Sequence, residues 1–211
     1  KLSIFEIGKT LSEVNESILK EPHMVQFYNR YATYNGSSPY STPGIMTVIQ
    51  HLESHYGTFI PEGGMHSITK SLYELAKRKG VIFNFNKFVS EIILKKNEVT
   101  GLIVEGEKLV FDIVVSNMDI YPTYEKLLPK IRLPRNVKSQ ERSSSAVIFY
   151  WGVSKIFKNL DLHNVFFSKD YRDEFDSIFI KKNIYDDPTI YVNITSKEIP
   201  KDSPENSENW F

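Results

Sequence analysis

The sequence has 211 residues, no cysteine, and 26 basic against 26 acidic side chains, so its formal net charge is zero. This length is enough for one or two domains with a sizeable buried core. The balanced charge argues against a nucleic-acid-binding surface, and the lack of cysteine excludes disulfides, thiolate metal sites and a cysteine nucleophile. No apolar run approaches the roughly 20 residues that span a bilayer, and no signal-peptide pattern opens the chain. We expect a cytoplasmic protein whose contact with a membrane, if it has one, is peripheral and on the inner face.

Two features of the chain ends predict a fragment of a longer protein. The chain does not begin with Met, and it stops at Trp210-Phe211, two large apolar side chains that normally need a buried site. Aromatic residues are frequent, with 14 Phe and 12 Tyr. They could line an apolar tunnel or fill a core, and the core is the more common use.

The first part of the chain is predicted to be helical. Apolar spacing over residues 2–19 indicates one helix or two, interrupted near Gly8. A second helix is predicted over residues 22–33, with a mostly aromatic face. After a loop rich in Gly, Pro and Ser, Thr42 and Pro43 predict the cap and first position of a helix that ends before Gly57.

The helix before Gly57 contains a pattern that resembles a metal site. His51 and His55 are four residues apart, so their rings can share a face, and Glu53 lies between them. Zinc proteases place the glutamate directly after the first histidine, and no third ligand is apparent. We therefore predict a solvated or partner-facing histidine pair and no metal site.

The middle of the chain begins with a helix and a strand. Apolar residues from Met65 to Ala76 recur at helical spacing, and Gly80 stops the helix. The apolar run at residues 81–83 is typical of a buried strand, so the pair suggests a parallel sheet.

Hairpin signals follow this strand. Short strands separated by polar turns, at residues 89–94, 99–104 and 109–111, predict a three-stranded antiparallel meander. Residues 112–117 then predict an apolar strand with a polar end. In open α/β sheets such a strand end is where ligands bind.

The last part of the chain predicts a second, antiparallel sheet. Three runs rich in β-branched and aromatic residues lie at 145–153, 163–167 and 189–195. Helices are predicted at 122–128 and 170–179. The tail from Lys197 is polar, and no element is predicted there.

Several segments of the chain together carry a resemblance to a known family. The central segments are PEGGMHSITKSL, GVIFNFNKFVSEI, NEVTGLIVEG and FDIVVSNMDIYPTYEKLLP. In order and spacing they resemble the middle of the bacterial phytoene (carotenoid) desaturases, flavoproteins related to the amine oxidases. Flanking segments, from RYATYNGSSPYSTPG to IYVNITS, extend the resemblance over nearly the whole chain. The agreement of several segments is far more specific than one short motif.

The resemblance implies an α+β fold, part of an FAD-binding amine-oxidase-like flavoprotein. Residues 1–60 would form the helical part of a substrate domain. Residues 61–119 would belong to the FAD-binding domain, with a helix, a buried strand and the β-meander. Residues 120–211 would supply the antiparallel sheet and helices of the substrate domain, into which the meander segment is thus inserted.

FAD is the cofactor that the resemblance implies for the full-length enzyme. The G-x-G-x-x-G turn that brings backbone to the pyrophosphate is absent, since none of the ten glycines makes even a G-x-G. The second glycine-rich flavin motif of the family is absent as well. We expect no tight FAD binding by this chain alone.

Five residues are candidates for contact with FAD. The resemblance implies that the backbone of Val89 contacts the adenine and that Ser116 and Asn117 lie near the ADP portion. Gly63 and Gly64 would let backbone pass close to a flat ring, before a helix with free N–H groups. On the residues alone we would favour an ordinary meander residue at Val89 and a strand-terminating turn at Ser116-Asn117. Gly63-Gly64 could also be only a permissive loop before a helix, and the resemblance favours the cofactor contact.

The implied substrate is a long apolar polyene such as phytoene, bordered by the aromatic helix and the loop after it. The substrate-binding candidates are Phe27, Arg30, Tyr31, Tyr34 and Tyr40. An ordinary packed helix is the equal alternative for this region. No side chain is a convincing catalytic acid or base, with Glu53 a weaker candidate than Arg30 or the tyrosines. We expect Arg30 to pair with an acidic residue.

The sequence therefore predicts FAD-dependent desaturation of a carotenoid precursor by the full-length protein, with this chain inactive by itself. Two alternatives stay open. One is a non-enzymatic module that binds isoprenoids or hydrophobic peptides through the aromatic residues of 27–40. The other is a related flavin oxidoreductase acting on another apolar substrate, such as a retinoid.

Overall fold

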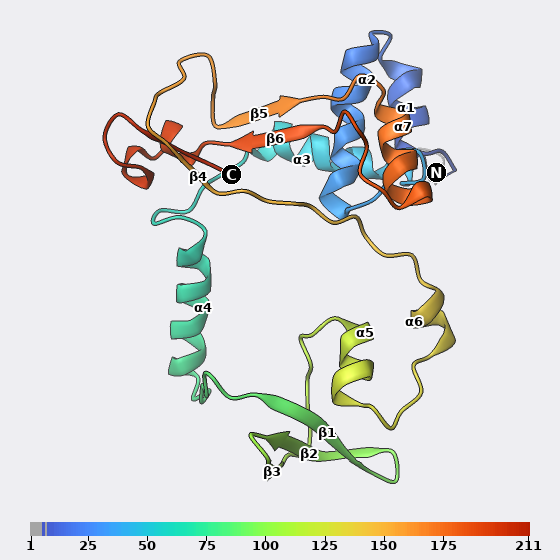
Figure 1. Cartoon of the computed structure of the whole chain (residues 1–211), viewed down its shortest axis with the longest axis vertical. Helices are drawn as coiled ribbons and strands as arrows, with labels where there is room; N and C mark the ends of the chain where they lie inside the picture. Colours follow the sequence, from blue (N-terminus) through green and yellow to red (C-terminus); the bar gives the residue numbers. More distant parts are fainter. Residues whose placement is uncertain (1–5, 7) are drawn as a thin grey trace. The chain divides into compact units, whose positions relative to one another are not determined.

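The computed structural model describes residue 6 and residues 8–211, and the chain divides into two compact units (Figure 1). Unit 1 contains the described residues up to Thr58 together with Ser143–Phe211, and unit 2 is Phe59–Arg142. Helices and antiparallel strands make up both units, which confirms the α+β class. None of the described helices combines the length and the apolar composition that crossing a bilayer requires. Residues 2–5, where the first predicted helix begins, lie outside the described part.

Unit 1 begins with short helices. They are α1 (Leu11–Ile18), α2 (Pro22–Asn29), the 3-10 helices η2 (Arg30–Asn35) and η3 (Gly44–Thr47), and α3 (Val48–Tyr56). α1 starts with a capping box, in which the Thr10 hydroxyl accepts a hydrogen bond from the Glu13 amide and the Glu13 carboxylate accepts one from the Thr10 amide. Proline in the first turn of α2 costs nothing, because its missing N–H would be unsatisfied there anyway.

The contact between α1 and α2 contains polar as well as apolar buried groups. Leu11 and Val14 of α1 are buried. Beside them, the Asn15 amide donates to Asn29 Oδ1 at 2.9 Å, and the Asn29 amide donates to Ser12 Oγ at 3.0 Å. These bonds satisfy side chains that would otherwise be costly to bury.

The helix predicted before Gly57 is present, but its predicted cap is wrong. The Thr42 hydroxyl donates to the Ser38 carbonyl at 2.7 Å and makes no bond to the helix. Pro43 is the N-cap of η3, which precedes α3, and is not the first helical residue. The reason is that Thr42 is buried in the preceding loop, where its hydroxyl is engaged by the Ser38 carbonyl and the Ser37 hydroxyl.

Two small antiparallel sheets complete unit 1. β5 (His163–Phe166) pairs with β6 (Ile190–Asn193), and β4 (Trp151–Val153) pairs with β7 (Glu208–Trp210). Backbone hydrogen bonds in both directions between Asn193 and Phe211 connect the end of β6 to the residue after β7. The segment between β5 and β6 contains α7 (Tyr171–Asp176) and the π-helical turn η5 (Ser177–Lys181), and the 3-10 turns η6 (Thr195–Lys197) and η7 (Pro200–Asp202) precede β7.

The strand predictions for unit 1 are correct for β5 and β6 and partly wrong for the rest. Of residues 145–153, only Trp151–Val153 forms a strand, because β7 is three residues long and pairs with those three alone. The tail beyond Lys197, where no element was predicted, contains β7. Its polar sequence carries no periodicity from which a strand could be predicted.

Unit 2 contains one long helix and the predicted meander. Its elements are α4 (His66–Arg78), β1 (Val89–Lys95), β2 (Glu98–Val104), β3 (Glu107–Val110), α5 (Ile120–Pro122), the π-helical turn η4 (Thr123–Leu127) and α6 (Arg135–Ser139). The strand order β1-β2-β3 confirms the meander. Gly101 is required in β2, since a Cβ there would lie 2.0 Å from the Leu109 carbonyl oxygen of β3. Ile92 and Leu127 are buried where β1 meets η4.

Two strands predicted in unit 2 are not formed. Residues 81–83 and 112–117 make no strand pairing among the described residues, and Ile82 and Val115 are 83% and 88% exposed. A strand needs a neighbour to complete its hydrogen bonds, and the described part of unit 2 offers none to these segments. The expected parallel sheet is therefore absent from the described residues, where every strand pairing is antiparallel.

Candidate functional site

A hydrogen-bonded cluster in unit 1 joins two helices. The Tyr31 hydroxyl donates to Glu53 Oε2 at 2.6 Å, and the Tyr34 hydroxyl donates to Oε1 of the same carboxylate. Tyr31 and Tyr34 lie one turn apart in η2, with stacked rings whose centroids are 5.6 Å apart, and Glu53 lies in α3. We call these three residues the Tyr–Glu cluster.

Both phenols of the Tyr–Glu cluster stay protonated at neutral pH. Burial and the hydrogen bond to Glu53 raise the pKa of Tyr31 well above its usual value. The same hydrogen bond, followed by burial, raises the pKa of Tyr34 to about 12. Each phenol therefore remains a donor. A carboxylate has about four acceptor positions, so two phenols leave part of its capacity unused.

Arg30 lies beside the Tyr–Glu cluster. Its guanidinium carbon is 5.0 Å from the ring centroid of Tyr191 in β6, and its charge partly offsets the rise in the pKa of Tyr34. Its recorded hydrogen bond is a long one, 3.4 Å to Thr33 Oγ1. Within the described part of the chain no ion pair is recorded for Arg30, which differs from the expected pairing with an acidic residue. Its charge faces an aromatic ring instead.

Three residues of the β5–β6 pair continue this polar region. The Tyr191 hydroxyl and His163 Nδ1 are 2.6 Å apart, and the Asn193 amide nitrogen lies 3.1 Å from the first and 3.2 Å from the second. These side chains share a face because Tyr191 and Asn193 are two residues apart in β6, and His163 is paired with Asn193. None of the three was a predicted site residue.

The two remaining substrate-binding candidates lie elsewhere in unit 1. Phe27 in α2 is half exposed and meets Tyr28 edge to face. Tyr40 packs edge to face against Phe175 of α7, with the Arg172 guanidinium 4.5 Å from its ring centroid. Burial raises the pKa of Tyr40 to about 12, and Arg172 partly opposes the rise. Tyr40 thus packs against α7 and takes no part in the hydrogen bonds of the Tyr–Glu cluster.

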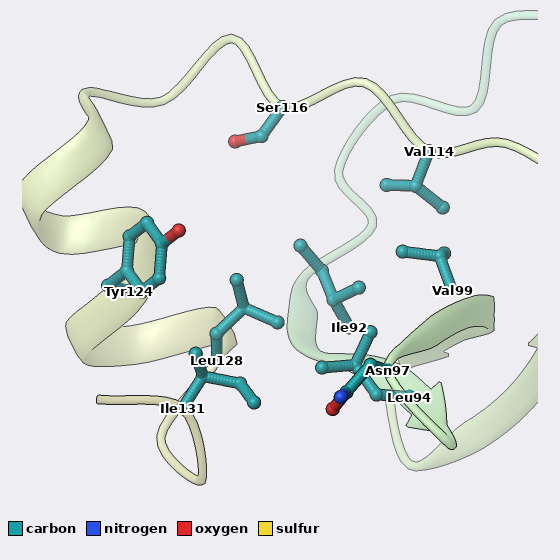
Figure 2. A pocket seen from close by; sticks show the side chains of 9 residues that line it. All are labelled: Ile92, Leu94, Asn97, Val99, Val114, Ser116, Tyr124, Leu128 and Ile131. Carbon is teal, nitrogen blue, oxygen red and sulfur yellow. The ribbon is translucent and has the colours of Figure 1, made fainter. Parts of the chain in front are cut away.

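In unit 2 a cavity of about 380 Å³ lies between the meander and the following helical segment. Figure 2 shows Tyr124 and Leu128 on one side of it and Ile92 and Val99 on the other. The side chains that line it are Ile92, Leu94, Asn97, Val99, Val114, Ser116, Tyr124, Leu128 and Ile131. The lining is mostly apolar, with a few polar groups, as is usual for a small-molecule site.

The five candidate cofactor residues all belong to unit 2. Ser116 lines the cavity and its hydroxyl lies 3.1 Å from Thr123 Oγ1, while Asn117 is exposed. Val89 opens β1, where a register shift interrupts the pairing with β2. Gly63 and Gly64 precede α4 with φ of 80° and 77°, which favours glycine, and a Cβ at Gly64 would meet nothing within 4 Å. No hydrogen bond recorded among the described residues links these three segments to one another.

The histidine pair is arranged as the helical spacing predicts. His51 and His55 stack with ring centroids 5.3 Å apart, and both are exposed. Glu53 is engaged by the two tyrosines instead. Over residue 6 and residues 8–211, no group of three His, Cys, Asp or Glu side chains could hold a metal ion.

Comparison with known proteins decides the family. The sequence model of the flavin containing amine oxidoreductases matches residues 3–189. The chain belongs to this family. The resemblance seen in the sequence is therefore confirmed, and FAD is the cofactor class of the family.

Three relatives of the chain within this flavoprotein family have carotenoid-related names. The chain is 52% identical over all 211 residues to 1-hydroxycarotenoid 3,4-desaturase from Flavobacterium sp. (strain P99-3), covering 43% of that protein. It is 35% identical over 178 residues, 83% of this chain and 31% of the relative, to phytoene desaturase from Fusarium fujikuroi. It is 32% identical over 207 residues, 97% of this chain and 41% of the relative, to 4,4'-diapolycopene oxygenase from Methylomonas sp. The chain thus spans less than half the length of these relatives.

A solved structure supports the fold assignment. An oxidoreductase from Methanosarcina mazei superimposes with a TM-score of 0.62, covering 96% of this chain and 46% of that chain, at 15% identity. Similarity at this level of identity shows the fold alone.

Some of these residues are predictable from the sequence, and others are not. The aromatic helix pattern led to Tyr31 and Tyr34, and Glu53 was noted as a weak acid-base candidate. Nothing in the sequence connects Tyr191 or His163 to Arg30, because the contact joins segments more than 130 residues apart. Tyr124 was not predicted to line the unit 2 cavity, because its sequence position does not show that η4 packs against the meander.

Proposed function

We propose that the full-length protein is an FAD-dependent oxidoreductase that desaturates C–C bonds of a carotenoid or carotenoid precursor. The observation that carries this proposal is the 52% identity to 1-hydroxycarotenoid 3,4-desaturase over the whole of this chain. Membership of the flavin containing amine oxidoreductase family supports the redox class. The phytoene desaturase relatives support a polyene as the substrate.

In this proposal, residues 61–119, which lie in unit 2, contribute to the FAD-binding domain, and residues 1–60 and 120–211 contribute to the substrate domain. Gly63 and Gly64 suit close approach of a flat ring, since a Cβ at Gly64 would meet nothing within 4 Å and one at Gly63 would contact only Ser67. The register shift between Val89 and Glu91 interrupts the β1–β2 pairing. Backbone N–H and C=O groups at Val89 could therefore form hydrogen bonds with the edge of an adenine ring. The exposed Ser116-Asn117 segment would meet the polar ADP portion. When bound, FAD would supply the hydride acceptor for the desaturation.

Unit 1 would bind and orient the polyene. Exposed aromatic and aliphatic side chains occur on α2, η2 and α3, including Phe27, Tyr34 and Leu52. Such a surface suits a long hydrocarbon and would exclude water from it. It also suits peripheral contact with a lipid surface from which a polyene is taken up.

The test is reconstitution of the full-length gene product with FAD. The purified protein would be supplied with phytoene or a hydroxylated carotenoid in lipid vesicles, with an electron acceptor, and the products separated by chromatography. We expect polyenes whose absorption moves to longer wavelength, because each desaturation extends the conjugation. The control is the same protein from which flavin has been removed.

Three other outcomes would contradict the proposal. A product that gains oxygen without new double bonds would indicate an oxygenase. Flavin binding without turnover of any carotenoid would indicate another apolar substrate. Failure of the complete protein to bind FAD would favour a non-enzymatic module for hydrophobic ligands.

A further inference from the structure

We propose that a polar cavity in unit 1 binds a phosphate that carries a primary ammonium group, as in phosphoethanolamine. Two sources offer this chemistry, the headgroup of phosphatidylethanolamine and free esters of phosphoethanolamine. The inference goes beyond the proposed function and does not depend on it. The cavity is separate from the exposed residues assigned to the polyene, since Phe27, Tyr34 and Leu52 do not line it.

The cavity has a volume of about 350 Å³ and is lined by α1, α2, the loop between η2 and η3, and the start of α7. This volume is near the lower end of the range for small-molecule sites, so the cavity suits a ligand the size of a headgroup and not a whole polyene. Its ionisable lining residues are Glu16, Tyr40, Lys169, Asp170, Tyr171 and Arg172.

Tyr171 is the residue that points to a ligand. It is only 7% exposed, and no hydrogen bond of its hydroxyl is recorded within the described part of the chain. A buried hydroxyl normally has a partner, because burial without one costs free energy. The Tyr40 hydroxyl likewise has no recorded hydrogen bond among the described residues, whereas the Gln26 and Asn29 amides already have protein partners. The two phenols are therefore available to a bound molecule.

Charged side chains of both signs surround these phenols. Burial raises the pKa of Tyr40 to about 12, the Arg172 charge opposes the rise, and the charges of Glu16 and Asp170 add to it. Both signs of charge therefore act on one hydroxyl, which remains a donor at neutral pH. Among the described residues no ion pair is recorded between Lys169 or Arg172 and a carboxylate. The Arg172 guanidinium lies 4.5 Å from the Tyr40 ring centroid, and this stacking leaves its N–H groups free to bind an anion.

This set of groups fits a phosphate with an ammonium attached better than it fits a bare anion. The guanidinium, the Lys169 ammonium and the phenols are donors for the phosphate oxygens. The carboxylates of Glu16 and Asp170 would repel an anion alone, but they stabilise one that carries a cation. A primary ammonium donates three hydrogen bonds, whereas a quaternary ammonium donates none and is bound mainly by aromatic faces. Because Arg172 already occupies a face of the Tyr40 ring, the primary ammonium is favoured.

The experiment measures binding of the full-length, FAD-loaded protein to two kinds of vesicle by co-sedimentation. One kind is pure phosphatidylcholine, and the other contains phosphatidylethanolamine, whose headgroup differs only in lacking three methyl groups. Binding of soluble phosphoethanolamine is measured in parallel by calorimetry. If the source is a lipid, we expect roughly tenfold tighter binding to the phosphatidylethanolamine vesicles. If the source is a soluble ester, we expect phosphoethanolamine to bind and the two kinds of vesicle to behave alike.

Variants assign the binding to the cavity. Tyr171→Phe removes only the buried hydroxyl and should weaken binding about tenfold, and Arg172→Gln should weaken it at least as much. Glu16→Gln should reduce the preference for the primary ammonium over the choline headgroup. Tyr28→Phe removes a phenol of α2 that does not line the cavity, and Lys201→Gln removes a positive charge elsewhere in unit 1. Both controls should bind as the unmodified protein does.

Equal binding to both kinds of vesicle, together with no binding of phosphoethanolamine, would overturn the inference and would indicate that the phenols are only hydrated. Equal losses in Tyr171→Phe and Tyr28→Phe would overturn it as well. If Tyr171→Phe does not fold, Arg172→Gln and Glu16→Gln decide, since both side chains are exposed. None of these measurements involves desaturation, so failure here leaves the proposed function intact.

Discussion

At the scale of single residues, a buried ion pair anchors the end of unit 1. Glu208 in β7 is only 2% exposed, and its carboxylate is 2.6 Å from Lys197 Nζ. It also accepts hydrogen bonds from the Trp210 indole at 2.8 Å and from the Phe157 amide at 2.9 Å. Every contact of this carboxylate is with a donor, so burial of its charge is tolerated.

Lys197→Met is expected to destabilise unit 1 by about 3–5 kcal/mol, because it leaves the buried Glu208 charge without its cation. The free energy of unfolding would be measured by chemical denaturation. Tryptophan fluorescence is suitable because both tryptophans, Trp151 and Trp210, are paired in the β4–β7 ladder. Lys201→Met, at an exposed lysine four residues on, is the control and should cost far less. Equal losses in the two variants would show that the pair contributes nothing.

The same carboxylate makes stability depend on pH. Burial acts to raise the pKa of Glu208, but the hydrogen bonds from Lys197, Trp210 and Phe157 outweigh it and lower the pKa below 4.5. A group with a lowered pKa in the folded state stabilises the fold above its unfolded pKa, and this stability is lost as the pH falls through the folded value. We expect the stability difference between the unmodified chain and Glu208→Gln to be constant near neutral pH and to shrink below about pH 4.5. A difference that does not change with pH would contradict this.

Gly64 tests the proposed FAD contact at the residue scale. Gly64→Val places a branched side chain at φ of 77°, on a backbone face that is otherwise open. We expect the full-length protein to bind FAD at least about tenfold more weakly, a loss of roughly 1.4 kcal/mol. The control is Gly106→Val in the β2–β3 turn, which has a similar φ of 86° and equally open space. The same FAD affinity in both variants would remove Gly64 from the site.

At the scale of elements, the meander depends on one close approach between strands. Gly101→Ala would place a Cβ 2.0 Å from the Leu109 carbonyl oxygen, so β2 and β3 must separate. We expect a loss of about 2–3 kcal/mol in the stability of the meander, measured by hydrogen exchange of the β2 amides. Gly106→Ala, in the adjoining turn with nothing within 4 Å, is the control and should cost about 1 kcal/mol. Similar losses would mean that β3 moves aside without cost.

Elements with local signals were predicted well, and elements that need distant partners were not. The meander was predictable because its strands are joined by short polar turns, so each strand has its neighbour close in sequence. Residues 81–83 and 112–117 have the composition of strands, but a strand also needs a neighbouring strand to pair with, and composition does not determine whether one is present. β7 shows the opposite case, since its polar sequence becomes a strand through pairing with Trp151–Val153.

At the scale of the whole molecule, several apolar segments of unit 2 are exposed. They are the α4 residues Ile68, Leu72 and Leu75, together with Ile82, Ile113 and Val115. Exposed apolar surface of this extent usually marks an interface. We propose that residues 81–83 and 112–117 pair with strands supplied by the rest of the full-length protein.

Hydrogen exchange tests this pairing. In the isolated chain the amides of residues 81–83 and 112–117 should exchange fast, and in the full-length protein with FAD they should be protected by about a hundredfold or more. The β1–β2 amides, paired in both cases, are the internal control. Fast exchange in both proteins would show that these segments are loops in the complete molecule.

The sequence by itself determined the flavoprotein family, the α+β class, the helices of the first part and the antiparallel meander. These follow from spacing, turn residues and segment order, all of which are local along the chain. Only the tertiary structure decided that Tyr31 and Tyr34 share the Glu53 carboxylate, that Arg30 lies on Tyr191, and that Lys197 neutralises Glu208. The physical reason is that a hydrogen bond or an ion pair depends on distance in space, and periodicity along the chain determines which face a residue occupies but not which distant residue it meets.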